Sequence, residues 1–366
     1  MPRVFISVGD PSGDIHAARL MQELQKLVPN IEFIGIGGEN MEQCGLRSII
    51  PISEISVVGF WEVLKKINTF RQLMTNCKTI LSNEKVDLFL PIDYPGFNIK
   101  LTKFAKSQNI PVVYYIAPQL WAWGKHRAKQ LQIVDKLFVV FPFEEQFFKN
   151  YGINAEFVGH PLLDNPLLQN TPTNYSEREN ILAILPGSRQ QEIDKHIELF
   201  VRSANLFREK FNNYRIVLAK STNANLSRYE SFIKYNEIEI EENSLELMVK
   251  SRLGIIKTGT SNLEAALCGM PFTMVYKTSN LSYVISKQLI DLNFISIVNI
   301  LEKRLIIDEI IQKDATPEKI SNSLIKIYEN SEKLSDILNS FANIRKILQK
   351  AGASKTVAQR IKDNFL

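Results

Sequence analysis

The clearest candidate for chemistry in this chain is a carboxylate that follows a buried strand. The apolar run 86–90 leads into Pro91-Ile92-Asp93-Tyr94-Pro95-Gly96-Phe97-Asn98. This pattern predicts a parallel strand that ends abruptly at the prolines and the glycine. Open α/β sheets bind their ligands at the carboxyl ends of strands, so Asp93 is placed to remove a proton from a bound hydroxyl. The alternative is a turn or helix cap that does no chemistry.

Two glycine-rich loops follow the first two predicted strands. The first loop is Gly9-Asp10-Pro11-Ser12-Gly13-Asp14 and the second begins at Gly35-Ile36-Gly37-Gly38. Their glycines allow tight turns, and the helix that follows the first loop favours an anion or a polar group at its N-terminus. The spacing is neither that of a dinucleotide fingerprint nor that of a P-loop. A plain strand–helix turn capped by Ser12 or Asp14 therefore remains an equal alternative.

The second half of the chain carries two more polar loops at predicted strand ends. Gly187-Ser188-Arg189 sets an arginine beside two small residues, which suits bidentate contact with a phosphate. Thr258-Gly259-Thr260 opens a helix whose amides and hydroxyls could face a diphosphate, and Glu264, one turn further on, could accept ribose hydroxyls. Each loop alone is also explained as helix capping. Both loops in one domain indicate a nucleotide-binding cleft.

In one segment, the apolar residues cover more of the predicted helix surface than the single face that a buried helix would use. The segment runs from Val57 to Met74, with lysines and an arginine off the apolar face. An ordinary buried face is one interpretation, and contact with a membrane or with acyl chains is the other. The second interpretation assigns that contact to Val57, Val58, Phe60, Trp61 and Leu64.

Strand-like runs and helical patterns alternate through most of the chain, which predicts parallel sheets covered by helices on both faces. A polar, turn-rich break at 165–179 favours two domains. We expect an N-terminal Rossmann-like domain at 1–166, a C-terminal one at 167–345 and a helical tail at 346–366 that could pair two chains. The expected strands are Val4–Val8, Ile31–Ile36, Leu88–Ile92, Val112–Ile116, Lys136–Phe141, Ile181–Leu185, Arg215–Leu218, Leu253–Lys257 and Phe272–Tyr276.

Composition narrows the functional class. The chain has 366 residues, 45% of them hydrophobic, and a net charge of 44 − 39 = +5. That charge is too small for a nucleic-acid-binding polycation but suits phosphorylated substrates or an anionic membrane surface. The aromatic and cationic cluster from Trp121 to Lys129 could accordingly bind a phosphorylated sugar, and nucleic acid is disfavoured.

Cysteine and histidine usage argues against metal and disulfide chemistry. The three cysteines are scattered, and the four histidines lack ligand spacing, so neither a disulfide nor a metal site is expected. The chain begins in a strand rather than a signal peptide, and no apolar run approaches the ~18 residues of a membrane span. A cytoplasmic location is expected.

Taken together, these motifs resemble the lipid-A-disaccharide synthases in both order and spacing. The likeness runs from about residue 4 to about residue 317 and includes the first loop, the Asp93 segment and the two polar loops of the second half. It also includes segments 35–38, 57–64, 115–123, 141–144, 157–161 and 296–299.

The resemblance implies an inverting glycosyltransferase of the GT-B type, with two doubly wound parallel-sheet domains facing across a cleft. Members join UDP-2,3-diacylglucosamine to 2,3-diacylglucosamine 1-phosphate (lipid X), releasing UDP, at the inner face of the cytoplasmic membrane and without a dissociable cofactor. Asp93 matches the family's general base. Asn299 joins the expected UDP-sugar site, and Arg127 joins the first loop on the acceptor side. The family's usual Glu, second Asp, Arg and Pro are here Asp10, Gly96, Gly124 and Val298.

Two other functions remain open from the sequence. One is a different GT-B enzyme that uses UDP-N-acetylglucosamine, either a 2-epimerase or a lipid-linked transferase. The other is a silent protein that binds nucleotide sugars or lipids. The apolar segment at 57–74 argues against a soluble epimerase. The joint presence of Asp93, Arg189 and Glu264 argues against a silent scaffold.

Overall fold

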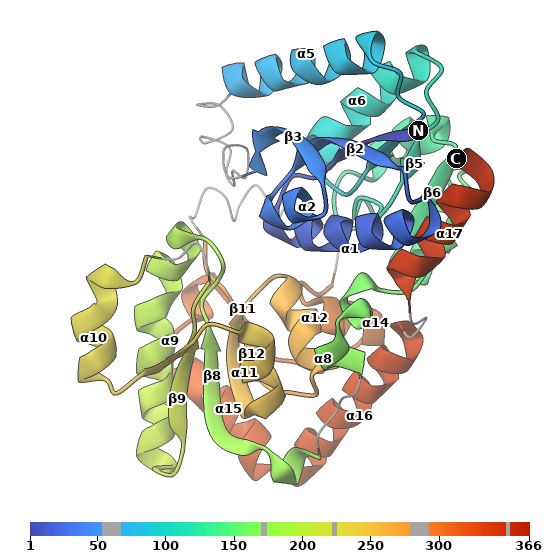
Figure 1. Ribbon diagram of the computed structural model, residues 1–366. Helices are drawn as coiled ribbons and strands as arrows, with labels where there is room; N and C mark the ends of the chain where they lie inside the picture. Colours follow the sequence, from blue (N-terminus) through green and yellow to red (C-terminus); the bar gives the residue numbers. More distant parts are fainter. Residues whose placement is uncertain (53–66, 170–173, 222–224, 279–292, 349–351) are drawn as a thin grey trace. The chain divides into compact units, whose positions relative to one another are not determined.

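The computed structural model describes residues 1–52, 67–169, 174–221, 225–278, 293–348 and 352–366 (Figure 1). The chain divides into two compact units. Unit 1 contains residues 1–164 and 348–366, and unit 2 contains residues 165–347. The assignment of functional domains to 1–166, 167–345 and 346–366 remains a prediction, as does the pairing of two chains through the tail.

Unit 1 is an α/β unit whose strands all pair in parallel. The strands are β1 (Arg3–Ser7), β2 (Glu32–Gly37), β3 (Leu46–Pro51), β4 (Leu88–Pro91), β5 (Val113–Tyr114), β6 (Lys136–Val139) and β7 (Ala155–Phe157). They form one group in the order β3-β2-β1-β4 and another in the order β5-β6-β7. Parallel bridges from Phe89 to Val112 and from Ile92 to Tyr115 connect β4 to the second group. The strand order therefore reverses between β1 and β4.

Helices cover both faces of the unit 1 sheet. They are α1 (Pro11–Leu27), α2 (Glu39–Gln43), α5 (Ile67–Asn83), α6 (Pro95–Ser107), α7 (Phe143–Lys149) and α17 (Ala353–Phe365), with 3₁₀ helices η1 (Lys125–Ile133) and η2 (Pro161–Asp164). α5 and α6 pack on one face through an apolar cluster that includes Phe5, Phe89 and Leu101. α1 lies on the other face (Figure 1), and α17 packs against it. Asp164 accepts from the amides of Ala353 and Ser354, both at 2.9 Å, and so fixes the start of α17.

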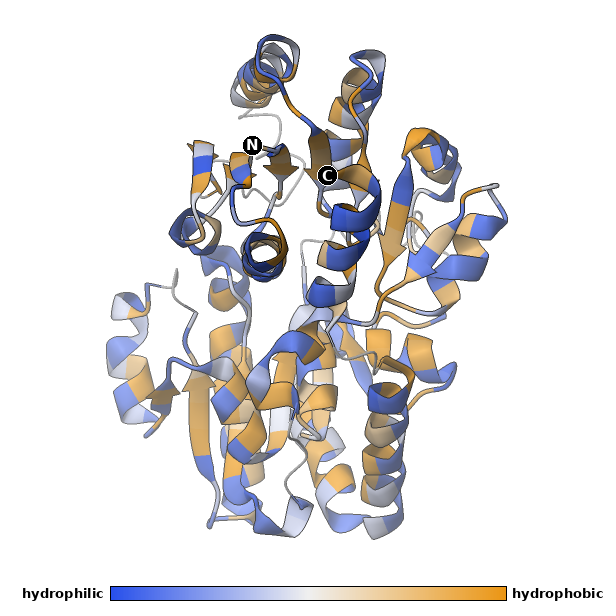
Figure 2. Ribbon diagram, turned by 45° about the vertical axis from the view of Figure 1, so that its right-hand side comes forward, coloured by the Kyte–Doolittle hydropathy of each residue, from blue (hydrophilic) through white to orange (hydrophobic). Residues whose placement is uncertain are grey.

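Unit 2 repeats the same topology with a six-stranded parallel sheet. Its strands are β8 (Glu179–Leu185), β9 (Arg215–Ala219), β10 (Glu239–Glu241), β11 (Ser251–Lys257), β12 (Phe272–Tyr276) and β13 (Glu309–Ile311). Their order is β10-β9-β8-β11-β12-β13, so the reversal falls between β8 and β11. Figure 2 shows the strands largely in the hydrophobic colour, as expected for parallel strands buried on both faces. The predicted α/β class with doubly wound parallel sheets is confirmed.

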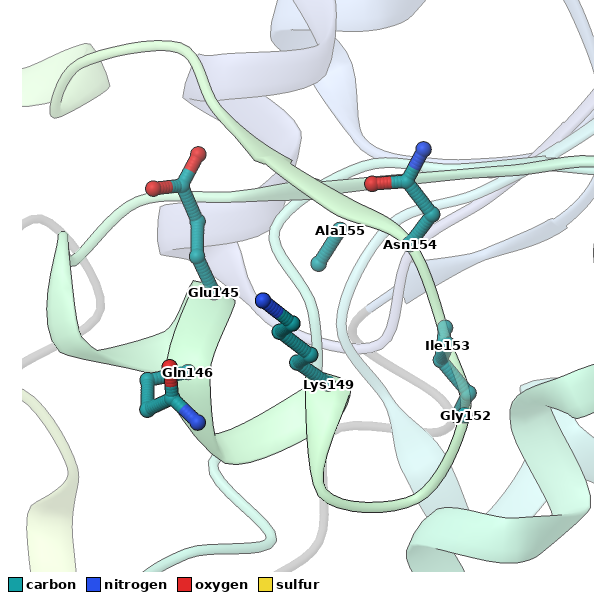
Figure 3. Close-up of a pocket in the computed structure, with 7 residues that line it drawn as sticks. All are labelled: Glu145, Gln146, Lys149, Gly152, Ile153, Asn154 and Ala155. Atoms are coloured by element: carbon teal, nitrogen blue, oxygen red, sulfur yellow. The ribbon is translucent and has the colours of Figure 1, made fainter.

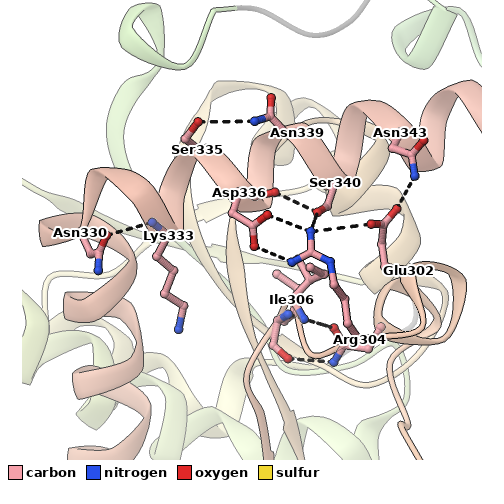
Figure 4. Close-up of polar contacts among 12 residues, drawn as sticks. Glu302, Arg304, Ile306, Asn330, Lys333, Ser335, Asp336, Asn339, Ser340 and Asn343 are labelled. Atoms are coloured by element: carbon pink, nitrogen blue, oxygen red, sulfur yellow. Dashed lines mark hydrogen bonds and ion pairs between the residues drawn. The ribbon is translucent and has the colours of Figure 1, made fainter.

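The helices of unit 2 end in a long pair near the C-terminus. They are α8 (Pro166–Gln169), α9 (Gln190–Lys210), α10 (Glu230–Tyr235), α11 (Ser244–Lys250), α12 (Thr260–Leu267), α14 (Ile297–Glu302), α15 (Pro317–Glu329) and α16 (Ser331–Leu348), with 3₁₀ turns η3 (Tyr175–Glu177), η4 (Ser227–Tyr229) and η5 (Gln312–Asp314). Arg304 follows α14, and its guanidinium donates to the two carboxylate oxygens of Asp336 in α16 at 2.7 and 2.8 Å. It also donates to the Ser340 hydroxyl of the same helix at 2.9 Å (Figure 4). This fork fixes α16 against the sheet layer.

A single buried amide joins the strands at the reversal point of unit 1. Asn98 is fully buried in the first turns of α6. Its Nδ2 donates to the carbonyls of Ser7 at 3.2 Å, Ile92 at 3.3 Å and Asp93 at 2.9 Å, and its Oδ1 accepts from the Ser7 hydroxyl at 2.7 Å. Asn98 thus holds the carboxyl ends of β1 and β4 in one arrangement.

We expect Asn98→Ala to lower the free energy of unfolding of unit 1 by about 1–3 kcal/mol, because the buried Ser7 hydroxyl loses its acceptor. Urea unfolding measures the change. The matched control is Asn339→Ala, since Asn339 is exposed and its side chain bonds only Ser335, at 3.5 Å, among the described residues. Equal effects of the two substitutions would contradict the role given to Asn98.

Candidate active site

Asp93 stands directly after β4, where the backbone leaves the strand in an unusual conformation. Asp93 and Tyr94 have φ values of 43° and 52°, in the left-handed region that costs a non-glycine residue of order 1–3 kcal/mol. The Asp93 amide donates to the carbonyls of Tyr115 at 3.3 Å and Ile116 at 3.2 Å. Its carbonyl accepts from Asn98 and from the Tyr114 hydroxyl. Neighbouring strands and α6 therefore hold the turn that presents the carboxylate.

The first loop and the Asp93 turn are in direct contact. A Cβ at position 9 would lie 2.1 Å from Cδ2 of Tyr94, so the ring of Tyr94 occupies the space that a side chain would need. Gly9 is therefore required by packing inside the unit. The predicted first-loop residue Gly13 is buried, and its amide donates at 2.7 Å to the carboxylate of Asp10, which caps α1.

Burial raises the pKa of the partly exposed Asp93 carboxyl to about 7, and the charge of Asp10 adds to the rise. A hydrogen bond from the Tyr94 amide acts in the opposite direction. A carboxyl with a pKa near neutrality is well matched to general base catalysis, because it is substantially ionised yet still basic. The role of Asp93 as the general base remains a prediction, which these features make testable.

The other two polar residues of the first loop, Asp14 and Ser12, differ in burial and in the number of hydrogen bonds they make. Asp14 is buried and accepts from the Gly38 amide at 2.7 Å, the Met41 amide at 3.2 Å, and the amide and side chain of Asn40 at 3.1 and 2.7 Å. Asp14 therefore joins the two glycine-rich loops and caps α2. Ser12 is partly exposed, with its hydroxyl 3.5 Å from Nε2 of His16.

A second buried carboxylate, Glu144, was not singled out from the sequence. It accepts from Nε1 of Trp121 at 2.8 Å and from the amides of Val140 and Phe141 at 3.1 and 3.0 Å. Burial raises the pKa of Glu144 to about 7, and Asp93 is close enough to contribute. An acidic residue in the first turn of a helix that follows an apolar strand was the available sequence indication.

Arg127, which the resemblance assigned to the acceptor side, lies near Trp123 and Tyr114 in unit 1. Its guanidinium is 5.5 Å from the ring centroid of the exposed Trp123. Burial and Asp93 raise the pKa of Tyr114, and the charge of Arg127 opposes that rise. Because the Tyr114 hydroxyl donates to the Asp93 carbonyl, Arg127 belongs to the same edge of the unit as the candidate base.

In unit 2 a tight turn presents Arg189 after β8. Gly187 has a φ of 133°, and a Cβ there would lie 2.6 Å from the side chain of Glu192. Glu192 accepts from the Ser188 amide at 3.1 Å and pairs with Arg189 at 3.3 Å. The predicted residues Gly187, Ser188 and Arg189 thus form one turn held by a carboxylate of α9.

The loop after β11 is open where α12 begins. Gly259 has a φ of 152°, and none of the described residues lies within 4 Å of a Cβ built on it. Gly259 and Thr260 are exposed, Thr258 is partly exposed, and no side chain in the described part of the chain caps α12. Free amides at such a helix start can bind an anion. Burial raises the pKa of the neighbouring Glu264 to about 7, and Ser261 opposes the rise through a hydrogen bond.

Asn299 is fully buried and committed to internal contacts. Its Nδ2 donates to the Ile307 carbonyl and to Glu309, both at 2.8 Å, and its Oδ1 accepts from the amides of Ile306 and Ile307 at 2.8 and 2.9 Å. Contact with a ligand would require breaking these bonds. We therefore leave Asn299 out of the nucleotide site proposed below.

Other predicted features fall elsewhere. Val57, Val58, Phe60, Trp61 and Leu64 lie outside the described residues. A surface pocket of about 560 Å³ is formed by α7 and the segment that leads into β7, and none of the predicted site residues lines it (Figure 3).

Within the described ranges, no helix is long and apolar enough to cross a membrane, and no three acidic, histidine or cysteine side chains are grouped to hold a metal.

Comparison with solved structures defines the class of fold. UDP-GlcNAc 2-epimerase from Neisseria meningitidis, bound to UDP-GlcNAc, is similar with a TM-score of 0.66 and 14% identity, over 99% of this chain and 100% of that one. The UDP-GlcNAc 2-epimerase of Methanocaldococcus jannaschii gives a TM-score of 0.61 with 14% identity, over 100% of both chains. The two parallel-sheet units are of the GT-B type, the fold of many glycosyltransferases and of these epimerases.

Sequence comparison identifies the family. A family model described as lipid-A-disaccharide synthetase matches residues 4–361. The lipid-A-disaccharide synthase of Coxiella burnetii (strain CbuG_Q212) is 32% identical over 98% of this chain and 97% of its own length. That of Persephonella marina is 33% identical over 99% of both. The chain belongs to the lipid-A-disaccharide synthase family and is a glycosyltransferase.

The raised pKa of Asp93 predicts a specific pH dependence. Turnover should rise with pH to a plateau above about 7, because the base must be ionised. Asp10→Asn keeps a capping side chain but removes a negative charge, so the midpoint of this rise should move to lower pH. An unchanged midpoint in the pH–rate profile would show that Asp93 does not control it.

The raised pKa of Asp93 also makes the stability of the protein depend on pH. The pKa of Asp93 is higher in the folded protein than its ordinary value of 3.8, so folding favours the protonated form. The contribution of Asp93 to the free energy of unfolding is therefore full below pH 4 and is lost as the pH rises through about 7. Asp93→Asn should flatten this part of the stability profile.

Proposed function

We propose that the protein joins UDP-2,3-diacylglucosamine to 2,3-diacylglucosamine 1-phosphate, giving lipid A disaccharide 1-phosphate and UDP. Family membership supports the overall reaction. The single observation that carries the assignment of the base is the Asp93 carboxylate. It is partly exposed at the carboxyl edge of the unit 1 sheet, and its pKa is raised to about 7.

In this reaction Asp93 removes the proton from the acceptor's 6-hydroxyl. The hydroxyl oxygen forms a bond to the anomeric carbon of the donor sugar while the bond from that carbon to UDP breaks on the opposite face. The anomeric configuration inverts, and the electron pair of the broken bond leaves with UDP. A sugar hydroxyl is a weak nucleophile, and a positioned base contributes ~10²–10⁴-fold in rate.

Unit 2 supplies the groups for the departing UDP. Arg189 carries a positive charge on the turn after β8, and the uncapped start of α12 presents backbone amides. Both can stabilise the negative charge that grows on the diphosphate, so no proton donor is needed there. Glu264, in the second turn of α12, is the proposed acceptor for ribose hydroxyls.

One carboxylate is sufficient for this mechanism. Gly96 stands where the family's second acidic residue is expected, and a Cβ built on it has no neighbour within 4 Å among the residues that the structure describes. The nearby Glu144 is fully buried and accepts from Trp121 and two backbone amides. We assign Glu144 to positioning Trp121 and the start of α7, with Asp93 as the base.

A direct assay separates this function from its competitors. Purified protein is incubated with both acylated glucosamine substrates, and UDP and the disaccharide 1-phosphate are measured. A 2-epimerase would instead convert UDP-N-acetylglucosamine to its 2-epimer without an acceptor. A silent binding protein would release no UDP.

The enzyme is further proposed to work at the inner face of the cytoplasmic membrane as a peripheral protein. Support comes from the acylated substrates, from the net charge of +5 and from the apolar segment that contains Phe60 and Trp61. The acyl chains of both substrates would remain in or near the bilayer while the sugars react.

Asp93→Asn, which is nearly isosteric, should lower turnover at least about a hundredfold. UDP binding should stay close to that of the unchanged protein and thermal stability should not fall below it, because the turn at Asp93 is held by its backbone. Calorimetry with UDP and a melting curve provide these controls. Near-normal turnover would reduce Asp93 to a turn residue.

The double change Phe60→Ser and Trp61→Ser should reduce sedimentation with anionic liposomes, because apolar side chains that enter the bilayer are lost. The control is Tyr235→Ser and Leu305→Ser, two residues of unit 2 that are 87% and 59% exposed. If Phe60 and Trp61 were core residues, the double variant would instead melt early, with a loss of about 3–5 kcal/mol for a buried aromatic.

A further inference from the structure

Three charged side chains meet at the strand reversal of unit 2, and the mechanism above uses only one of them. Glu192 accepts from Nζ of Lys257 at 2.9 Å and lies 3.3 Å from the guanidinium of Arg189. Its other oxygen accepts from the Ser188 amide at 3.1 Å. The carboxylate therefore bridges two cations and fixes the turn that carries one of them.

Lys257 occupies the place where open sheets bind ligands. It is the last residue of β11, and the residue before it, Ile256, pairs with Leu185 at the end of β8. The carboxyl ends of these two strands flank the reversal of strand order, which is the usual ligand position in doubly wound folds. α12 begins three residues after Lys257, and its N-cap residue, Gly259, has no side chain to cap it.

The charges of this cluster do not balance. Burial alone would raise the pKa of Glu192, but Lys257, Arg189 and the Ser188 amide together hold it below its usual value, so the carboxylate stays ionised. Two cations against one carboxylate leave a net positive charge, to which the start of α12 adds. An ammonium group has three donors, and within the described ranges the ammonium group of Lys257 donates only to Glu192.

We propose that Lys257 is a second cation for the diphosphate of UDP, and that Glu192 is a positioning residue that holds Lys257 and Arg189 at one end of the site. This inference rests on the proposed function. When the bond between the anomeric carbon and the diphosphate oxygen breaks, UDP gains one negative charge. Lys257 and Arg189 would both stabilise that charge, and the acceptor's proton goes to Asp93.

The competing explanation is that Lys257 is only the counter-ion of Glu192. In that case its loss would destabilise the turn after β8 without changing affinity for the phosphates in particular. Affinity must therefore be compared between a ligand with the diphosphate and a ligand without it.

Calorimetry with UDP and with uridine makes this comparison. Lys257→Met should weaken UDP binding about tenfold or more, as expected for one charge-assisted contact, and leave uridine binding unchanged. Lys257→Arg should restore most of the UDP affinity, and turnover should fall in Lys257→Met even at saturating substrate. The control, Lys250→Met, removes an exposed lysine of the same unit that pairs with Glu246 at 3.9 Å.

A second variant guards against loss of folding. Glu192→Gln combined with Lys257→Met removes both partners, so no buried charge is left unpaired, and this protein should also bind UDP about tenfold or more weakly. Arg189→Ala is the reference, since it should weaken UDP binding whether or not Lys257 takes part. Normal UDP affinity in both Lys257 variants, with a loss in Arg189→Ala, would overturn the proposal for Lys257 alone. A wild-type protein that binds no UDP would overturn the proposed function with it.

Discussion

The active edge of unit 1 depends on the hydrogen bonds of Asn98. Two strands that are adjacent in space but distant in sequence end at Ser7 and Pro91, and the amide of Asn98 bonds the chain at both ends. The strained conformation of Asp93 persists because that amide, the Tyr114 hydroxyl and the carbonyls after β5 all bond its backbone. The carboxylate itself is left available for chemistry. A fixed backbone and an available side chain are what a general base requires.

Hydrogen bonding also separates the carboxylates that stabilise the fold from those that we propose to contact the substrates. Asp14, Glu144 and Glu309 each accept from two or more backbone amides, and each fixes the start of a helix. Their hydrogen-bonding capacity is largely used inside the protein. Asp93 and Glu264 differ, because Asp93 accepts from a single backbone amide, that of Tyr94, and Glu264 accepts from the side chain of Ser261. The number of amides bound by a carboxylate is therefore a better guide to its role here than its position near the strand ends.

The sequence predicted the central strands well and missed the outer ones. Nine predicted strands correspond to β1, β2, β4, β5, β6, β8, β9, β11 and β12, whereas β3, β7, β10 and β13 were not predicted. All four missed strands lie at sheet edges, where strands are short and half-covered and lack the continuous apolar run of a buried strand. For the proposed site, the positions of polar residues at strand ends singled out Asp93, Arg189 and the start of α12. It could not find Glu144 or Lys257, because their partners, Trp121 and Glu192, are 23 and 65 residues away.

The position of α17 has a consequence for how the protein is made. α1, near the beginning of the chain, buries Ala17, Leu20 and Met21, and α17, the last helix, packs against it. All of unit 2 is synthesised between these two helices. Until α17 has been synthesised, unit 1 therefore lacks one of its packing partners, and the part of α1 that α17 covers stays exposed. Unit 2 is a continuous segment and can fold first, whereas unit 1 reaches its final form only after α17 has packed against α1.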